Sequence, residues 1–233
     1  MTVPLKIWIT RAQPGAEATA ERVRRLGHEP LVAPLLEVRR LAEVEVDLTG
    51  VKALAFTSAN GVRAFAELSG ERGFQVFAVG AATAQAARSA GFRRVLSTDG
   101  DVSALAEGIA ARRSEIGGLV LHPGAAELAG DLTGALADAG IEVRALTLYE
   151  TTPTTLPAEQ IAGLSQVQMA LVHSPKGGRA LAAVLAAHPQ PQLRILAISQ
   201  AALAPLRDTP AAAKVSSPFP LEAALLNLID RQP

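Results

Sequence analysis

The sequence predicts two α/β domains, each built on a doubly wound parallel sheet, and three observations support this prediction. Short apolar runs alternate along the chain with amphipathic stretches of helical length. Several of these stretches end at a glycine, which often terminates a helix. Two different segments recur in the order A–B–A′–B′, which indicates a duplication rather than a repeat array. Alternating strands and helices are typical of parallel sheets with helices on both faces.

The B segment is an apolar run followed by the start of a helix. Residues 56–64 (FTSANGVRA) recur at 172–180 (VHSPKGGRA), with serine, glycine, arginine and alanine at matching places. The A segment recurs from 26–37 to 139–150 and places Tyr149 opposite Leu36. Each domain is therefore expected to combine one A and one B segment.

The apolar runs and the amphipathic stretches define the expected elements in chain order. In the first half, strands are predicted at Leu5–Ile9, Leu31–Ala33, Val51–Thr57, Val76–Val79 and Val95–Ser97. The helices between and after them are predicted at Ala16–Leu26, Gly61–Leu68, Ala81–Ala90 and Val102–Arg112. In the second half, strands are predicted at Leu119–Leu121, Met169–Val172 and Arg194–Ile198. The helices of that half are predicted at Glu127–Ala139, Gly178–Ala187, Ala201–Arg207 and Leu221–Ile229.

Two short segments, Val38–Arg40 and Thr151–Thr154, follow the A units and are expected to be two crossing points between the domains. If B pairs with A′, residues 40–148 form an inserted domain, and residues 1–36 with 153–233 form the other. One A and one B unit together supply about five strands, the size of a flavodoxin-like sheet. A tandem duplication, with A paired to B and A′ to B′, stays open. Two such domains are expected to leave a cleft, where ligands usually bind.

Composition argues against several classes of function. The chain has no cysteine, which excludes disulfides, thiolate metal sites and cysteine nucleophiles. A formal net charge of zero and 3% aromatic residues disfavour a nucleic-acid surface and base stacking. The first residues lack a signal-peptide pattern, and no apolar run approaches the roughly 18 residues of a membrane span. We therefore expect a cytoplasmic monomer that binds neither nucleic acid nor membrane.

Small, hydroxylated or glycine-rich turns follow six of the predicted strands and open helices. Backbone N–H groups and helix dipoles at such places favour anions, so the six turns together suit a ligand with several carboxylates or phosphates. The same residue types are also ordinary helix caps, so the shared pattern counts for more than any one turn. The candidate binding residues are Thr10, Arg11, Ser58, Asn60, Gly61, Gly80, Thr83, His122, Ser174, Lys176, Gly177 and Ser199.

The sequence holds no motif for a metal or a cofactor, and none is expected. It has no Gly-x-Gly-x-x-Gly and no Walker lysine, and its four histidines lack metal-ligand spacing. Chemistry without these groups depends on positioning and electrostatic control of a reactive substrate. Tyr149 is the only tyrosine and precedes the predicted connector. It is either a proton or hydrogen-bond donor at the ligand, or a core or hinge residue.

Six motifs occur in this chain in an order that resembles the uroporphyrinogen-III synthase family of haem biosynthesis. No single motif is specific, but the ordered set covers nearly the whole chain. The motifs lie at residues 9–15 (ITRAQPG), 26–36 (LGHEPLVAPLL), 56–62 (FTSANGV), 78–83 (AVGAAT), 140–151 (GIEVRALTLYET) and 173–175 (HSP).

This resemblance implies two α/β domains, each built from distant chain segments and joined by a two-stranded connector. It also implies a lyase that needs no cofactor. Its substrate would be hydroxymethylbilane, a linear tetrapyrrole with eight carboxylates. Loss of the hydroxyl as water gives an azafulvene, the terminal pyrrole attacks it, and a spiro intermediate re-closes with the last ring inverted.

By the same resemblance, Tyr149 would assist departure of the hydroxyl, and Thr83 and Ser174 would position the ligand. One departure from the family pattern is the turn at 199–202 (SQAA), where the family often has a Gly-Pro-Thr-Thr-like turn. The alternative function is a non-catalytic anion- or tetrapyrrole-binding module of the same fold.

Overall fold

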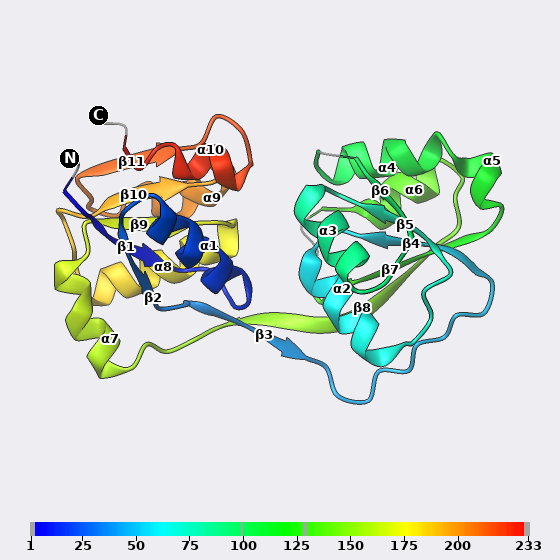
Figure 1. The fold of residues 1–233 in the computed structure, drawn as a ribbon, viewed down its shortest axis with the longest axis horizontal. Coiled ribbons are helices and arrows are strands. Elements are labelled where there is room, and N and C mark those ends of the chain that lie inside the picture. The colour runs from blue at the N-terminus through cyan, green and yellow to red at the C-terminus, as the bar shows by residue number, and fades with distance from the viewer. Residues whose placement is uncertain (1–2, 99, 128–129, 231–233) are drawn as a thin grey trace. The chain divides into compact units, whose positions relative to one another are not determined.

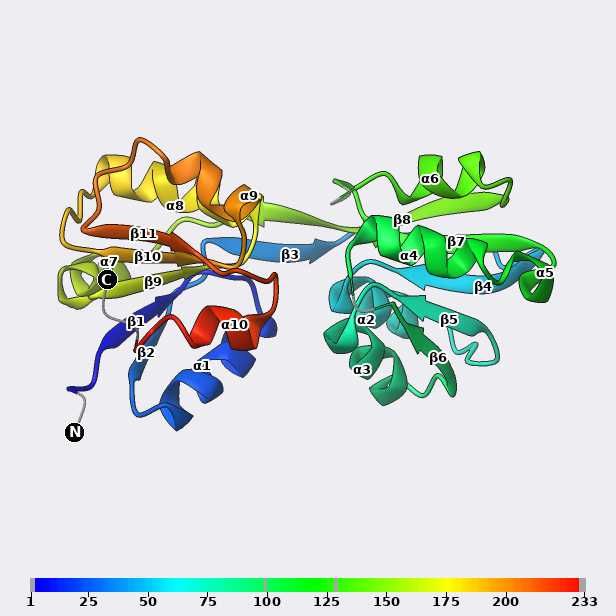
Figure 2. The same ribbon diagram turned by 90° about the horizontal axis from the view of Figure 1, so that it is seen from above.

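The computed structural model describes residues 3–98, 100–127 and 130–230, and its chain forms two compact units. Unit 1 comprises Met1–Glu37 and Thr152–Pro233, and unit 2 comprises Val38–Thr151. Each unit has its own sheet with helices on both faces, as Figure 1 and Figure 2 show. The α/β fold class expected from the sequence is confirmed.

The sheet of unit 1 is fully parallel and joins strands from the two ends of the chain. β1 pairs on one side with β2 and on the other with β9, where Ile9 lies opposite Leu171. This order of strands is that of flavodoxin-like sheets. Across the sheet the strands are β2 (Glu29–Val32), β1 (Lys6–Ile9), β9 (Met169–Val172), β10 (Arg194–Ala197) and β11 (Ala213–Ser216).

The helices of unit 1 cover both faces of this sheet because its strands are apolar on both faces. One face packs against α1 (Gly15–Arg25) and α10 (Glu222–Leu226). The other packs against α7 (Ala158–Gly163), η1 (Leu164–Gln166), α8 (Pro175–Ala187), α9 (Gln200–Leu203) and η2 (Ala204–Leu206).

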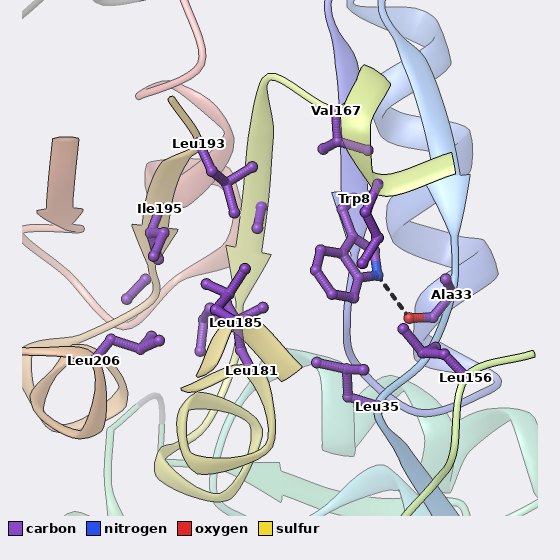
Figure 3. Close-up of a cluster of buried hydrophobic side chains, with 14 of the residues drawn as sticks. Trp8, Ala33, Leu35, Leu156, Val167, Leu181, Leu185, Leu193, Ile195 and Leu206 are labelled. Atoms are coloured by element: carbon purple, nitrogen blue, oxygen red, sulfur yellow. Dashed lines mark hydrogen bonds between the residues drawn. The ribbon is translucent and has the colours of Figure 1, made fainter. Parts of the chain in front are cut away.

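The fully buried Trp8 lies in the hydrophobic core between the sheet and the second group of helices, which includes α8 (Figure 3). Its indole N–H donates to the carbonyl oxygen of Ala33 at 2.7 Å, so the polar atom of this large side chain is satisfied.

The sheet of unit 2 repeats the spatial order of unit 1, although the strands follow one another differently along the chain. β7 from the A′ segment pairs in parallel with β4 from the B segment. Beside β8 runs β3, tied by bonds from Leu41 N–H to the Leu148 carbonyl and from Thr154 N–H to the Leu35 carbonyl. Across the sheet the strands are β3 (Leu36–Arg40), β8 (Val143–Pro153), β7 (Leu119–Ala125), β4 (Val51–Phe56), β5 (Gln75–Ala78) and β6 (Arg94–Ser97).

Two layers of helices also enclose the sheet of unit 2. One face packs against α2 (Ala59–Leu68) and α3 (Ala81–Ser89), and the other against α4 (Val102–Ala110) and α6 (Leu132–Asp138). The short α5 (Arg113–Ile116) precedes β7. Phe56 on β4 meets Phe65 on α2 edge to face, with 5.9 Å between the ring centroids. Such aromatic pairs fix how a helix packs on its sheet.

Two expected boundaries in unit 2 are wrong. β7 does not end at Leu121 but continues to Ala125 through Pro123. Past Leu121 the strand pairs only with β8. Its other side makes no hydrogen bonds to a neighbouring strand there, so a proline, which lacks an N–H, is tolerated. Helix α6 begins at Leu132 rather than Glu127, because the Asp131 carboxylate accepts from the Gly134 N–H at 2.7 Å and caps the helix there.

Other elements were shortened or missed. The helix expected at Ala201–Arg207 is split into α9 and η2, and the one at Leu221–Ile229 shortens to α10. The elements α7, η1 and β11 were not expected at all. β11 is four residues long with one apolar β-branched residue, so its pairing with β10 defines it more than its own composition does.

A close helix contact in unit 1 predicts that Gly178→Ala is destabilising. A Cβ on Gly178 would overlap the carbonyl oxygen of Ala202 on the neighbouring helix α9. Backbone must shift to relieve this, so we expect the free energy of unfolding to fall by roughly 1–3 kcal/mol in urea denaturation. Gly163→Ala is the control, because nothing lies within 4 Å of its Cβ position. Equal stability of the two variants would show that α8 and α9 do not depend on this contact.

Candidate functional site

Most of the candidate residues lie where the strand order of each sheet reverses, whereas Gly80 and Thr83 follow β5 and Ser199 follows β10. In unit 1, α1 leaves β1 toward one face and α8 leaves β9 toward the other. In unit 2, α2 follows β4 and α6 follows β7 in the same way. Ligands of open α/β sheets bind at the carboxyl ends of the strands at such a switch point. Each unit by itself therefore has one natural binding edge.

Two serines cap helices at these edges with matching geometry. The Oγ of Ser58 accepts from the Gly61 N–H, and the Oγ of Ser174 accepts from the Gly177 N–H, both at 3.0 Å. Ser199 caps α9 likewise, accepting from Ala202 at 3.2 Å. Repeated sequence thus produces repeated local structure. Each cap also satisfies one of the N–H groups that a helix start leaves without an internal partner.

Ser58 has a second partner, the only tyrosine. Its Oγ lies 2.6 Å from the phenol oxygen of Tyr149, near the end of β8. Tyr149 is 5% exposed, and this burial raises the pKa of its phenol, while the smaller effect of the Ser58 hydrogen bond lowers it. The phenol therefore remains protonated at neutral pH and is able to donate.

Unit 1 has no phenol at the equivalent place. Leu36 corresponds to Tyr149 in the repeat, and its Cδ1 lies 3.9 Å from the position of a Cβ on Gly177. An apolar side chain thus stands near the capping turn of α8. The two units share the same backbone arrangement, but the side chain near the capping turn is a phenol in unit 2 and an apolar leucine in unit 1.

The sequence predicts His122 in a turn that opens a helix. In the structure it is instead a buried residue of a strand. It lies within β7, is 1% exposed, and its Nε2 is 3.3 Å from the Oγ1 of Thr57. Burial lowers the pKa of His122, so the ring is neutral at pH 7 and offers no positive charge to a carboxylate. Its contact holds Thr57, the residue before Ser58.

Two threonines among the candidates also point inward. Thr10 is fully buried, and its hydroxyl donates to the Leu171 carbonyl at 2.7 Å across the β1–β9 pair. Thr83 in the first turn of α3 is 5% exposed. Both side chains are buried in this structure. Contact of Thr10 and Thr83 with a ligand stays a prediction.

The remaining candidates in the helix starts are partly exposed. Gly80 precedes α3 and caps it without a side-chain bond, and Asn60 accepts from the guanidinium of Arg63 at 3.0 Å. Lys176 lies in the first turn of α8, beside Gly177.

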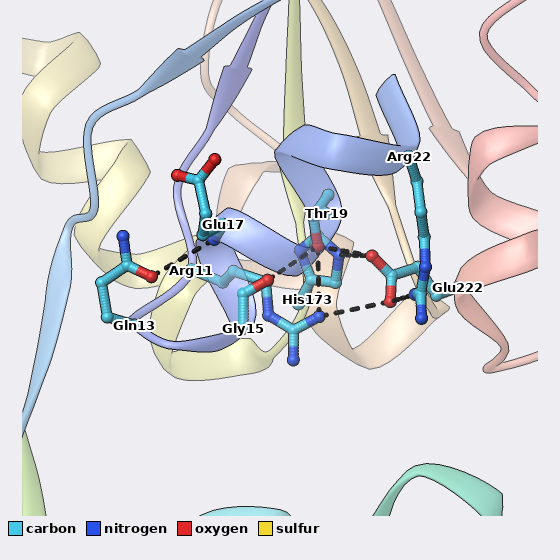
Figure 4. Close-up of polar contacts among 8 residues, drawn as sticks. All are labelled: Arg11, Gln13, Gly15, Glu17, Thr19, Arg22, His173 and Glu222. Carbon is cyan, nitrogen blue, oxygen red and sulfur yellow. Dashed lines mark hydrogen bonds and ion pairs between the residues drawn. The ribbon is translucent and has the colours of Figure 1, made fainter. Parts of the chain in front are cut away.

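A cluster of charged side chains lies at the edge of unit 1, and most of it was missed from the sequence (Figure 4). The carboxylate of Glu222 contacts Arg22, Thr19 and, at 3.5 Å, Arg11. His173 lies beside it, with Nε2 3.9 Å from Glu222 Oε1. Burial, and then the charges of Arg11 and Arg22, lower the pKa of His173 to about 3. Arg11 was expected, whereas no sequence signal links Glu222 to it.

A hollow of about 450 Å³ in unit 1 lies beside α9, η2 and β11. Its lining includes Lys214, whose ammonium donates to the carbonyls of Leu206, Arg207 and Thr209. Because this cation caps the end of a helical turn, we assign no carboxylate of a ligand to the hollow. Within residues 3–98, 100–127 and 130–230, no three His, Asp or Glu side chains are grouped to hold a metal ion.

Sequence comparison decides the family. A family model described as uroporphyrinogen-III synthase HemD matches residues 17–227, most of the chain. The chain belongs to the uroporphyrinogen-III synthase family. The expected family and its function in tetrapyrrole and haem biosynthesis are confirmed, and a non-catalytic module is not favoured. A search of curated proteins gave no match.

Solved structures show the same fold. Uroporphyrinogen-III synthetase from Helicobacter pylori 26695 has a TM-score of 0.69 at 18% identity, covering 97% of this chain and 98% of that one. A mutant uroporphyrinogen III synthase from the extremely thermophilic bacterium Thermus thermophilus has a TM-score of 0.52 at 17% identity, with 96% and 97% covered. At this identity the likeness concerns the fold alone. No helix within the described residues is long and apolar enough to cross a membrane.

The Ser58–Tyr149 bond predicts how the single tyrosine titrates. Burial raises the pKa of Tyr149 and the serine lowers it, so the phenol should ionise above the usual value near 10 and higher still in Ser58→Ala. Absorbance of the one tyrosine against pH measures this directly. Ser174→Ala removes the same kind of cap in unit 1, where the serine bonds to Gly177, so its midpoint should equal that of the wild type. Thermal unfolding followed by circular dichroism reports whether both units stay folded, and equal midpoints in all three folded proteins would contradict the bond.

Proposed function

We propose that the chain is a cofactor-free lyase that converts hydroxymethylbilane to uroporphyrinogen III, with loss of water and inversion of the last pyrrole ring. Family membership supports the reaction. The observation that carries the mechanism is the Ser58–Tyr149 pair at the switch point of unit 2, 2.6 Å between oxygens. It supplies a neutral proton donor beside a helix start.

The pair forms a chain of hydrogen bonds that ends in a donor. The Gly61 N–H donates to Ser58 Oγ, and either oxygen of the Ser58–Tyr149 pair is able to donate to the other. We assign the serine proton to the oxygen of Tyr149 in the substrate-bound state. The phenol proton then points to the leaving hydroxyl of the substrate. As the carbon–oxygen bond breaks, its electron pair stays on oxygen, the hydroxyl takes the phenol proton of Tyr149 and departs as water. The pyrrole N–H proton returns to the phenolate of Tyr149 as the azafulvene forms. Linked donors polarise one another, so the start of α2 strengthens the phenol as an acid.

The carboxylates of the substrate suit the helix starts at both edges. Capped helix N-termini present N–H groups and a positive dipole, and both favour anions. Arg11 adds a guanidinium at the edge of unit 1, with its side chain 34% exposed. We propose that Ser58, Asn60, Gly61 and Gly80 in unit 2, and Arg11, Ser174, Lys176, Gly177 and Ser199 in unit 1, contact the substrate.

The main task of the protein is then to direct ring closure. Once water has left, the azafulvene is reactive, and attack through the unsubstituted position of the terminal pyrrole gives the isomer without inversion. Holding the carboxylates fixes which carbon reaches the electrophile, so positioning selects the product. The lyase needs no metal or cofactor for either step.

We also propose where and in what form the protein works. Its zero net charge and scarce aromatic side chains support a small-molecule partner rather than nucleic acid or membrane. The absence of cysteine fits a reducing cytoplasm. We propose a monomer, because each switch point is complete within one chain.

A product assay tests the function. Purified protein is mixed with hydroxymethylbilane, and the cyclic products are oxidised and separated by isomer. The lyase predicts the inverted isomer in excess over a sample without protein. A non-catalytic binding module predicts the same isomer mixture with and without protein, even when the tetrapyrrole is bound.

The proton-donor role predicts that Tyr149→Phe loses turnover but not binding. The change removes one hydroxyl and keeps the ring, so we expect kcat to fall at least about tenfold, the lower part of the range for general acids. The measurement is the initial rate of uroporphyrinogen III formation. Melting temperature and affinity for uroporphyrin III, the stable oxidised product, serve as controls and should change little. Full activity in the variant would make Tyr149 a packing residue.

A further inference from the structure

We propose that His122 is a positioning residue for the proton donor, because it holds the turn that presents Ser58 to Tyr149. Its ring acts through Thr57, the residue that precedes Ser58. The inference rests on the proposed function and says how unit 2 keeps the geometry of its donor pair.

The strand position itself does not require a histidine. His122 is 1% exposed on β7, and Leu121 before it is equally buried. In the repeat, Ile9 is the corresponding residue of β1 and is also fully buried. A buried polar ring costs free energy unless it is hydrogen-bonded, whereas an isoleucine carries no such cost. What His122 adds at this place is its contact with Thr57.

That contact crosses from β7 to the turn that opens α2. The Nε2 of His122 lies 3.3 Å from the Oγ1 of Thr57, which directly follows β4. Ser58 comes next, with an extended backbone (φ −154°, ψ 152°), and caps α2. Because neighbouring Cα atoms are fixed about 3.8 Å apart, holding the Thr57 side chain limits how far Ser58 is able to move.

A second contact holds the start of α2 against the same strand. A Cβ on Gly61 would lie 2.8 Å from the carbonyl oxygen of Pro123, the residue after His122. The helix therefore approaches β7 to a distance that a larger residue would prevent. Gly61 is also the N–H donor to Ser58, so two successive residues of β7 contact the two ends of the capping turn.

β7 also directs Tyr149 toward this turn. The register of β8 against β7 shifts by one residue between Thr147 and Tyr149, so Leu148 is an extra residue in β8. Such a bulge changes the face to which the following side chain points. Leu148 and Tyr149 are adjacent, yet both pack in the hydrophobic core that includes α2, which regular alternation would not allow. One strand therefore fixes the positions of both oxygens of the donor pair.

The test compares two substitutions of His122 that keep different polar atoms. Glutamine carries an amide at the distance of Nε2 and is able to bond Thr57, whereas asparagine reaches only as far as Nδ1. Loss of the bond loosens the donor pair, so His122→Asn should lower kcat for uroporphyrinogen III roughly two- to tenfold, the worth of one hydrogen bond. His122→Gln should stay within about twofold of the wild type. Affinity for uroporphyrin III, measured by calorimetry, should change little in both.

The absorbance titration of Tyr149 gives a readout that needs no substrate. The Ser58 hydrogen bond lowers the pKa of the phenol, so a loosened bond should raise the midpoint in His122→Asn and not in His122→Gln. Thr57→Val keeps the shape of the threonine, loses the hydroxyl and should repeat the effect of His122→Asn. The double variant should lose no more than either single variant. Thr57→Val carries the test if His122→Asn does not fold.

Ile109→Val is the control for lost stability. Ile109 is fully buried in the other core of unit 2, so this variant should keep the wild-type kcat and tyrosine midpoint. The positioning role is overturned if His122→Asn keeps the kcat or the midpoint of an active wild type, or if His122→Gln loses as much. Additive losses in the double variant, or the same losses in Ile109→Val, overturn it too.

The two readouts separate this inference from the function. A wild type that makes uroporphyrinogen III, while the tyrosine midpoint is the same in His122→Asn, refutes the positioning role alone. A midpoint that shifts as expected, in a protein whose wild type makes no product, refutes the proposed function alone.

Discussion

The pairing of strands from distant parts of the chain is the constraint on which the rest of the structure depends. β1 pairs with β9 in one sheet, and β4 pairs with β7 in the other. Each of these pairs is the point where helices leave toward opposite faces, so each creates a binding edge. The corresponding strands keep one spatial order in both sheets although their order along the chain differs. The hydrogen bond from the Thr10 hydroxyl to the Leu171 carbonyl joins the ends of β1 and β9.

On this common frame, small differences in side chains give the two edges different chemistry. Ser58 and Ser174 cap their helices alike, but Tyr149 faces the first serine and Leu36 lies near the second turn. Unit 2 therefore carries a proton donor, and unit 1 carries the guanidinium of Arg11. The duplicated backbone presents a capped helix start at either edge, a geometry that favours anions, while single differences in side chains separate the chemistry of the two edges.

The sequence predicted the features that depend on residues close together in the chain. Periodicity located the buried strands, and the repeated serine three residues before a glycine located the caps of α2 and α8. It failed where tertiary contacts decide. The sequence predicts that the strand ends at Leu121, before Pro123, yet β7 continues there along β8 alone, and so His122 lies in a strand and not in a turn. The contact between Arg11 and Glu222 spans nearly the whole chain and has no local signature. The inward orientation of the Thr10 hydroxyl has no local signature either, because its acceptor is the carbonyl of Leu171 on a strand distant in the chain.

The central claim is that both switch points bind the carboxylates of the tetrapyrrole. Amide chemical shifts measured by NMR during titration with uroporphyrin III test it most directly. The account predicts large shifts at residues 57–61 and 174–177, which open α2 and α8, and little change at Gly27, Gly91 and Gly140, the turns that end helices α1, α3 and α6. Shifts confined to those turns, or to the hollow beside Lys214, would contradict it.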